Sequence, residues 1–201
     1  MLAGMGYRVC GVERSEQMIR QARERVSGAE NPCFVQADIR KFSLERKFDA
    51  AISLFHVMSY LKDLDNFTEV LRLVYEHLNE NGVFIFDTWY GPAVLMEKPE
   101  TRIKRLENES IAVTRLAEPV MRENENIVEV HYDIFVKNKS ENSIKEIKEV
   151  HNMRYYFLSE IDFCLKSCGF RLEACFGFMT GKELSRNTWG SMFVARKRDD
   201  V

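Results

Sequence analysis

Residues 6–25, GYRVCGVERSEQMIRQARER, decide the expected fold of this chain. The segment 7–12 has the apolar character of a buried β-strand, and Glu13 follows at its carboxyl end. Ser15 then opens a helix in which apolar residues recur at helical spacing. A carboxylate at the end of such a strand accepts hydrogen bonds from the ribose hydroxyls of a nucleoside. Residues 1–6 contain no strand and glycine-rich turn of the kind that precedes it, so the pattern predicts one half of a nucleoside site.

The composition is that of an ordinary soluble globular domain. The 201 residues are 45% hydrophobic and 30% charged, which is enough for one apolar core with a small elaboration. The formal net charge of −2 offers no attraction to nucleic acid, so we expect a small-molecule partner. No stretch approaches ~20 apolar residues and no signal-peptide pattern is present, which predicts no membrane partner and a cytoplasmic location.

The five cysteines predict free thiols. Their number is odd and they include no Cys-x-x-Cys, which favours a reducing compartment over a disulfide framework. Cys164 and Cys168 lie four residues apart on an expected helix and could serve as metal ligands. No further cysteine or histidine lies nearby, so we expect them to pack in the core and expect no metal.

Strand and helix patterns alternate through the first ninety or so residues. Apolar strands are expected at 33–37, 49–54 and 83–87, with a helix at 67–78 that ends in a left-handed Asn81-Gly82 cap. Near-continuous apolar strands between helices are typical of a parallel sheet that is covered on both faces.

Residues 102–157 have a different hydrophobic pattern. Apolar and polar residues partly alternate there between Asn- and Glu-rich turns, which predicts an antiparallel insert between core segments 1–101 and 158–201. The insert strands are expected at 103–106, 111–116, 127–136 and 144–157. The core then resumes with a helix between Ser159 as N-cap and Gly169 as C-cap. Two closing strands are expected at 172–176 and 192–196.

Five pieces of sequence in this order resemble the class I S-adenosylmethionine-dependent methyltransferases. They are GVERSEQMIRQAR (11–23), QADI (36–39), FDAAISLFHVMSYL (48–61), LNENGVFIFDTW (78–89) and MFVARK (192–197). The resemblance implies an α/β, Rossmann-like sheet with an inserted antiparallel hairpin region and without the first strand. It also implies S-adenosylmethionine as cofactor. The segments 83–90 and 128–132 further resemble small-molecule, nucleotide-sugar N-methyltransferases, so the expected acceptor is an amine or hydroxyl of a small molecule.

The resemblance also implies roles for residues at strand ends. Glu13, with Arg14 beside it, would bind the ribose hydroxyls. Asp38 would accept a hydrogen bond from the adenine amino group, and Ile39 would pack on the ring. An N-cap role is the alternative for Asp38. The pocket around the sulfonium and methyl group would be shaped by Ser53, Leu54 and Phe55.

Methyl transfer needs alignment and exclusion of water more than it needs a catalytic dyad. His56, after a strand end, and His131, on an insert strand, are candidates to orient or deprotonate the substrate. For His56, a hydrogen bond within its own loop is the alternative, and for His131 the alternative is exposure to solvent. Candidate substrate contacts, each with packing or solvation as the alternative, are Tyr60, Trp89, Tyr90 and Arg154.

The missing first half of the site leaves two interpretations. We expect an N-terminally truncated chain whose cofactor binding is impaired, because the absent strand would lie centrally and leave unpaired backbone groups on its neighbours. The alternative is a non-catalytic methyltransferase-like scaffold or partner-binding subunit that has lost the cofactor loop. In either case the insert 102–157 would be a lid or a dimerisation element, and a homodimer could form through it by sheet addition. A nicotinamide dehydrogenase would also carry an acid after its second strand, but not the other pieces together.

Overall fold

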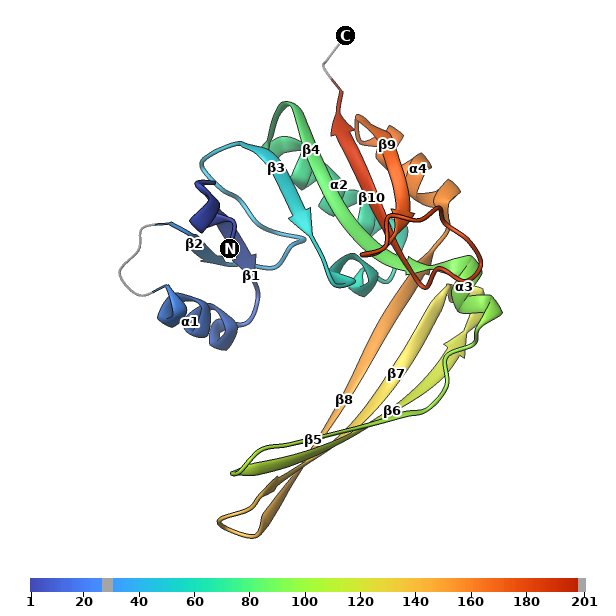
Figure 1. The fold of residues 1–201 in the computed structure, drawn as a ribbon. Coiled ribbons are helices and arrows are strands. Elements are labelled where there is room, and N and C mark those ends of the chain that lie inside the picture. Colours follow the sequence, from blue (N-terminus) through green and yellow to red (C-terminus); the bar gives the residue numbers. More distant parts are fainter. Residues whose placement is uncertain (27–30, 199–201) are drawn as a thin grey trace.

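The computed structural model describes residues 1–26 and 31–198, which form two sheets (Figure 1). The small sheet pairs β1 (Cys10–Glu13) in parallel with β2 (Cys33–Gln36), in a register that sets Glu13 opposite Gln36. Helix α1 (Glu16–Arg25) connects the two strands, and the short η1 (Ala3–Met5) precedes them. The strand–acid–helix unit expected from residues 6–25 is therefore present. We call residues 1–26 and 31–37 the lobe.

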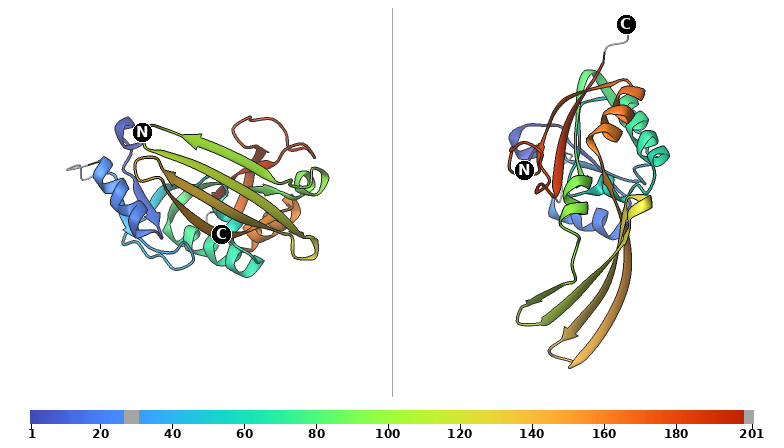
Figure 2. Two further views of the ribbon diagram at one scale, coloured as in Figure 1. Left: turned by 90° about the horizontal axis from the view of Figure 1, so that it is seen from below. Right: turned by 90° about the vertical axis from the view of Figure 1, so that its right-hand side faces the viewer.

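The large sheet forms the core of the molecule. Its central strand is β4 (Leu78–Tyr90), which pairs in parallel with β3 (Phe48–Ser53) and antiparallel with β10 (Gly190–Lys197). Strand β9 (Phe170–Gly177) pairs antiparallel with β10. The helices are α2 (Leu64–His77), the short α3 (Gly91–Met96) and α4 (Leu158–Ser167), with η2 (Val57–Tyr60) after β3. Helices α2 and α4 lie on the same face of the sheet (Figure 2).

The α/β class is confirmed, but the single parallel sheet expected from the strand pattern is not formed. Among the described residues β3 pairs only with β4 and β1 only with β2, so the two sheets remain separate. The large sheet is mixed and mostly antiparallel. Strand β3 is also not covered on both faces: Ile52 is 50% exposed, because α1 packs with the lobe and not over β3.

Residues 102–156 form a long antiparallel arm that projects from the core (Figures 1 and 2). Its strands are β5 (Arg102–Glu107), β6 (Ile111–Arg122), β7 (Ile127–Asn138) and β8 (Ser143–Tyr156), with η3 (Glu123–Glu125) between β6 and β7. The end of β8 pairs in parallel with β4, where Trp89 is opposite Tyr155 and Tyr90 opposite Tyr156. The four insert strands expected from the alternating pattern are therefore all present.

Two apolar clusters hold these parts together. The main cluster lies between the large sheet and the helices α2 and α4; its members include Phe67, Leu71, Phe84, Phe86, Ile161, Leu165, Phe170 and Phe193. Cys164 and Cys168 belong to the same cluster, so they pack as expected. The second cluster anchors the base of the arm and consists of Val94, Val128, Val130, Met153 and Tyr155. Within the described ranges, every helix is too short or too polar to cross a lipid bilayer.

The helix ends partly follow the sequence pattern. Ser15 caps α1 as expected and accepts a hydrogen bond from the Met18 N–H at 3.3 Å. The other predicted ends were wrong. Helix α2 ends at His77, and Asn81 takes the left-handed conformation beyond it, in a turn where a side chain on Gly82 would meet the Asn79 carbonyl oxygen.

The N-cap of α4 also differs from the expected Ser159. Helix α4 starts at Leu158, because the Glu160 carboxylate accepts the N–H of Phe157 at 3.0 Å and so satisfies the first turn. At the other end Cys168 is the C-cap, and Gly169 follows it with a φ of +83°.

Candidate functional site

The chain is strained where β3 ends. Phe55 and His56 both have a φ of +65°, a left-handed conformation that is uncommon for residues other than glycine. The backbone N–H of His56 lies 3.1 and 3.0 Å from the two carboxylate oxygens of Asp87, a fully buried residue of β4. Such strain persists only where the surroundings hold it, and it concentrates at functional sites. Asp87 therefore fixes a special backbone turn at the carboxyl edge of the large sheet.

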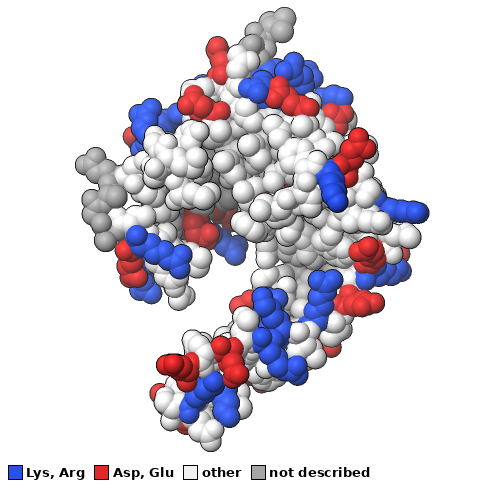
Figure 3. Space-filling model, viewed as in Figure 1, with Lys and Arg blue, Asp and Glu red and all other residues white. Residues whose placement is uncertain are grey.

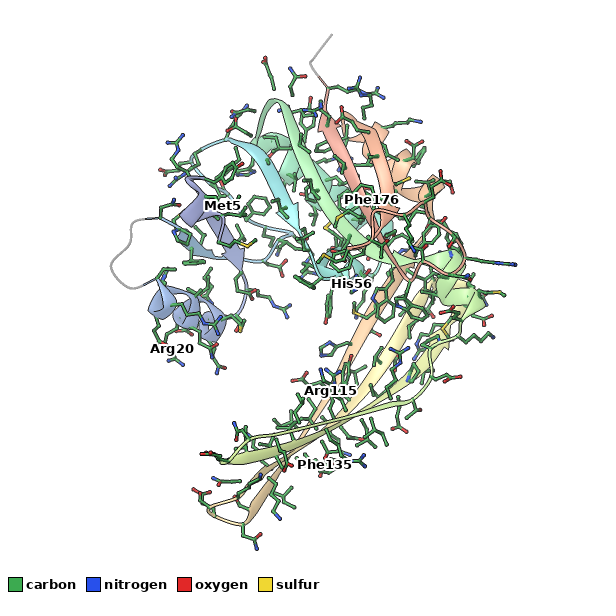
Figure 4. The ribbon with its side chains drawn as sticks, viewed as in Figure 1. Met5, Arg20, His56, Arg115, Phe135 and Phe176 are labelled. Atoms are coloured by element: carbon green, nitrogen blue, oxygen red, sulfur yellow. The ribbon has the colours of Figure 1, made fainter. Side chains whose placement is uncertain are left out.

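The ring of His56 is held by the same carboxylate and by aromatic neighbours. Its Nδ1 lies 2.6 Å from Asp87 Oδ2, although the two do not form a well-aligned hydrogen bond. The ring centroid is 6.3 Å from that of Trp89 and 5.5 Å from that of Phe178. A Cβ on Gly190 would come within 3.2 Å of His56 Cε1, so the absence of a side chain at Gly190 makes room for the ring. Figure 4 shows His56 at the lower edge of the core, above the arm.

Aromatic side chains continue this edge. Phe55 is 72% exposed and meets Phe178 edge to face at 5.6 Å. Trp89 meets Trp189 at 5.7 Å, and Tyr90 is half-buried, so that desolvation raises the pKa of its phenol. Such rings suit the apolar faces of sugars or the cationic end of an amine. Phe178 and Trp189 therefore add to the rings of Phe55 and Trp89 at this edge.

Acidic side chains mark the carboxyl edge of the small sheet. Glu13 is exposed, and its Oε1 accepts the N–H of Ser15 at 2.7 Å. Asp38 forms a two-point ion pair with Arg40, with Nε at 2.9 Å and Nη2 at 2.7 Å. These hydrogen bonds from Arg40 lower the pKa of Asp38 to about 2, so its carboxylate stays ionised. Asp38 also accepts the backbone N–H of Arg40, in a local turn, and does not cap a longer helix.

The residues expected to hold the adenosine end and the sulfonium end of S-adenosylmethionine lie at or just beyond the ends of β1, β2 and β3. Glu13 keeps one carboxylate oxygen without a partner in the part of the chain that the structure describes, as a ribose-binding acid requires. Ile39 packs against the main cluster, while Ser53 ends β3 and Leu54 leads into the strained turn. The Arg14 carbonyl accepts the Gln36 side-chain amide at 3.3 Å, which ties the chain beyond β1 to β2. Figure 3 shows a hollow between the lobe, the core and the arm.

Two of the expected site residues are placed elsewhere. His131 lies on the opposite face of the arm from Tyr132 and His151, beside an open depression of about 490 Å³, and its Nε2 contacts Glu129 at 2.8 Å. It therefore does not face the core. The guanidinium of Arg154 is buried, contacts the Lys62 and Glu125 carbonyls and pairs with Glu160 at 3.0 Å. These contacts join the arm to the core, which argues against a role for Arg154 in holding the substrate.

Two site residues escaped the sequence reasoning. Asp87 is the only charged residue in the apolar run 83–87, and that position at the strand end was its signal. His151 forms a hydrogen bond with Tyr60 where the arm meets the core. In the sequence, the signal for this residue was a glutamate two positions before it on the same strand, Glu149.

The chain is similar to known methyltransferases. Residues 1–82 match the family described as a methyltransferase domain. A dTDP-3-amino-3,4,6-trideoxy-alpha-D-glucopyranose N,N-dimethyltransferase of Streptomyces venezuelae is 27% identical over 175 residues, which are 87% of this chain and 70% of that protein.

Two solved structures share the fold. A S-adenosylmethionine-dependent methyltransferase from Clostridium acetobutylicum has a TM-score of 0.82 at 22% identity, covering 96% of this chain and 76% of that one. A sugar N-methyltransferase from Streptoalloteichus has a TM-score of 0.78 at 21% identity, covering 94% and 71%. The core is therefore Rossmann-like. The match of residues 1–82 to a methyltransferase domain agrees with this fold and with the acids at the ends of β1 and β2.

Proposed function

We propose that this protein transfers a methyl group from S-adenosylmethionine to the amine of a small molecule, and that the amine is carried by a nucleotide sugar. The Streptomyces venezuelae relative acts on a dTDP-amino sugar, which supports this acceptor class. The observation that carries the proposal is the turn at Phe55–His56, held by Asp87 beside an aromatic edge. A left-handed residue of this kind costs about 1–3 kcal/mol, and such strained residues cluster at functional sites.

In this proposal the end of β1 binds the cofactor, and the turn after β3 positions the reacting groups. When bound, S-adenosylmethionine supplies an electrophilic methyl group on a good leaving group. Glu13 binds the ribose, and the turn after β3 positions the reacting end. The exposed Phe55, with Trp89 and Tyr90, holds the acceptor and keeps water away, while Tyr60 contacts the acceptor from η2. Alignment of this kind can contribute several kcal/mol, roughly 7–11 in well-oriented systems.

The first experiment is calorimetric titration with S-adenosylhomocysteine. We expect 1:1 binding that Glu13→Ala weakens by about tenfold or more, because a charge-assisted hydrogen bond contributes ~1.5–3 kcal/mol. Glu16→Ala, on the adjacent first turn of α1, is the control and should bind normally. An absence of binding at millimolar ligand would contradict the site and favour the sequence-based expectation of impaired cofactor binding.

The second experiment tests transfer itself. The protein is incubated with S-adenosylmethionine and the dTDP-3-amino sugar that the relative's name specifies, and the product is analysed by mass spectrometry. A gain of one or two methyl groups on nitrogen supports the proposal. Cofactor binding without transfer to this or other amino sugars would overturn the acceptor class while keeping the cofactor site.

The organisation of the chain follows from the same proposal. We propose that residues 1–101 and 158–201 are the methyltransferase core and that 102–157 is an inserted lid or dimerisation element. Strand β5, which is exposed along its length at the edge of the arm, supports a homodimer through the arm. We also place the reaction in the cytoplasm, which the five free thiols support.

A further inference from the structure

The arm brings a histidine to the core beside the proposed acceptor site. The phenol oxygen of Tyr60, in η2, lies 2.7 Å from Nδ1 of His151, in β8. The other ring nitrogen, Nε2, lies 3.0 Å from Glu149 Oε2. Residues 60 and 151 are far apart in sequence, and they meet because β8 packs against η2.

The contacts define one protonation pattern. A carboxylate only accepts hydrogen bonds, so Nε2 of His151 carries a proton and donates it to Glu149. In the neutral ring Nδ1 is then an acceptor, and Tyr60 donates its O–H to it. The phenol therefore points its proton at a histidine whose second nitrogen already faces a carboxylate, which is the arrangement of an oriented base.

The surroundings of His151 keep this chain intact. Its ring meets Tyr132 of β7 edge to face at 4.9 Å, and Arg115 of β6 lies over Tyr132 at 5.2 Å, on the arm below His56 in Figure 4. Burial, followed by the charges of Tyr132 and Glu149, raises the pKa of Tyr60 above its ordinary value. Among the described residues, the titratable groups in contact with His151 are thus Tyr60, Tyr132 and Glu149, and the charge of Arg115 lies beyond Tyr132. Side chains of Glu149 and Tyr60 are about half exposed, so both ends of the chain reach open space.

We propose that His151, oriented by Glu149, is a positioning residue that accepts the proton of Tyr60 as Tyr60 takes the proton released by the methylated amine. This inference rests on the proposed amine methylation. The acceptor nitrogen forms a bond to the methyl carbon while the carbon–sulfur bond breaks. The electron pair of the broken carbon–sulfur bond stays on sulfur. The resulting alkylammonium gives one proton to Tyr60 Oη, the original phenol proton moves to His151 Nδ1, and the imidazolium is balanced by Glu149 until water removes the proton. Loss of this proton restores a neutral amine, which a second methylation requires.

The chain contains a matched control for this role. His131 in β7 has the same relation to Glu129, two residues before it, with Nε2 at 2.8 Å from the carboxylate. It lies on the opposite face of the arm and has no contact to Tyr60. If losing a histidine–glutamate pair disturbs the arm in general, substitutions of His131 and of His151 should have the same effect on the rate. If His151 accepts a proton, only its own substitution should lower the rate.

The first test needs neither cofactor nor substrate. Ring ¹⁵N chemical shifts of the histidines distinguish a protonated from an unprotonated nitrogen. We expect the neutral ring of wild-type His151 to carry its proton on Nε2. Tyr60→Phe should shift its Nδ1 resonance and leave His131 unchanged. A His151 that interconverts freely between tautomers, or that does not respond to Tyr60→Phe, would overturn the inference.

The second test measures steady-state kinetics with S-adenosylmethionine and the dTDP-3-amino sugar. We expect His151→Gln to lower kcat by about 10²-fold, at the low end of general acid–base contributions, with little change in KM. Free imidazole should partly restore His151→Ala, and His131→Gln should match wild type.

The outcomes separate this inference from the proposed function. Equal rates for His151→Gln and wild type, or equal losses for His151→Gln and His131→Gln, refute the role of His151 while amine methylation stands. A wild-type protein that binds S-adenosylhomocysteine but methylates no amine refutes the proposed function, and the inference falls with it.

Discussion

Asp87 illustrates how one buried side chain can define a site. It accepts the His56 N–H with both oxygens and contacts the ring, so it holds two consecutive left-handed residues in place. Asp87→Asn keeps the volume but replaces one acceptor by a donor. We expect a loss of about 1–3 kcal/mol in the free energy of unfolding, measured by urea denaturation. Asp49→Asn is the control, because Asp49 is exposed and accepts a hydrogen bond from the Asn79 side chain, and it should change stability by less than about 0.5 kcal/mol. Equal effects of the two substitutions would show that Asp87 does not stabilise the strained turn.

The two arm histidines show why residue roles were only partly predictable. Both His131 and His151 lie on strands and follow a glutamate at the second preceding position. Successive side chains on a strand point to opposite faces, so a histidine faces the core or solvent according to the pairing register. That register is set by contacts between β6, β7 and β8, which the local sequence does not encode. Sequence reasoning therefore named His56 and Tyr60, which follow a strand end, and named His131, which the structure places on the outer face of the arm.

At the level of elements, the N-cap hydrogen bond of α2 is shorter than that of α1. The Asp63 carboxylate accepts the N–H of Asn66 at 2.7 Å, whereas Ser15 Oγ is 3.3 Å from the N–H of Met18. Helix α2 also packs four buried side chains on the core, and α1 packs one. We expect Asp63→Ala to cost about 1 kcal/mol of unfolding free energy, within the usual range for N-caps, and Ser15→Ala to cost less. Urea denaturation of both variants measures the order, and a larger loss for Ser15→Ala would contradict it.

Element types were easier to predict than element partners. The alternating residues of the arm and the periodic apolar residues of α2 are local patterns, and the structure confirms both. The order of strands in the sheet does not follow from such local patterns. Strand β10 lies between β4 and β9, and β8 pairs with β4 through two residue pairs. These pairings join distant segments, so the parallel sheet that the apolar strands predicted was wrong for most of the large sheet.

On the scale of the whole molecule, the arm ends in an edge strand that is suited to self-association. Every residue of β5 is exposed, and its outer edge has no partner strand in the part of the chain that the structure describes. Two large apolar side chains on it, Ile103 and Leu106, are 54% and 59% exposed. An open edge of this kind is a template for pairing with a second chain, and two identical edges satisfy one another in a symmetric dimer.

We therefore expect the protein to sediment as a dimer at tens of micromolar, with backbone amides of β5 more protected from hydrogen exchange as concentration rises. Ile103→Lys should weaken the dimer by about tenfold or more, because it places a charge beside the paired edge where the partner's backbone approaches. Phe163→Lys is the matched control: Phe163 is 71% exposed on α4, on the core and not on the arm, so its substitution should leave the dimer unchanged. A monomer at all concentrations would refute the dimer itself. A dimer that only Phe163→Lys disrupts would move the contact from the arm to α4 and leave the arm free to act as a lid over the site.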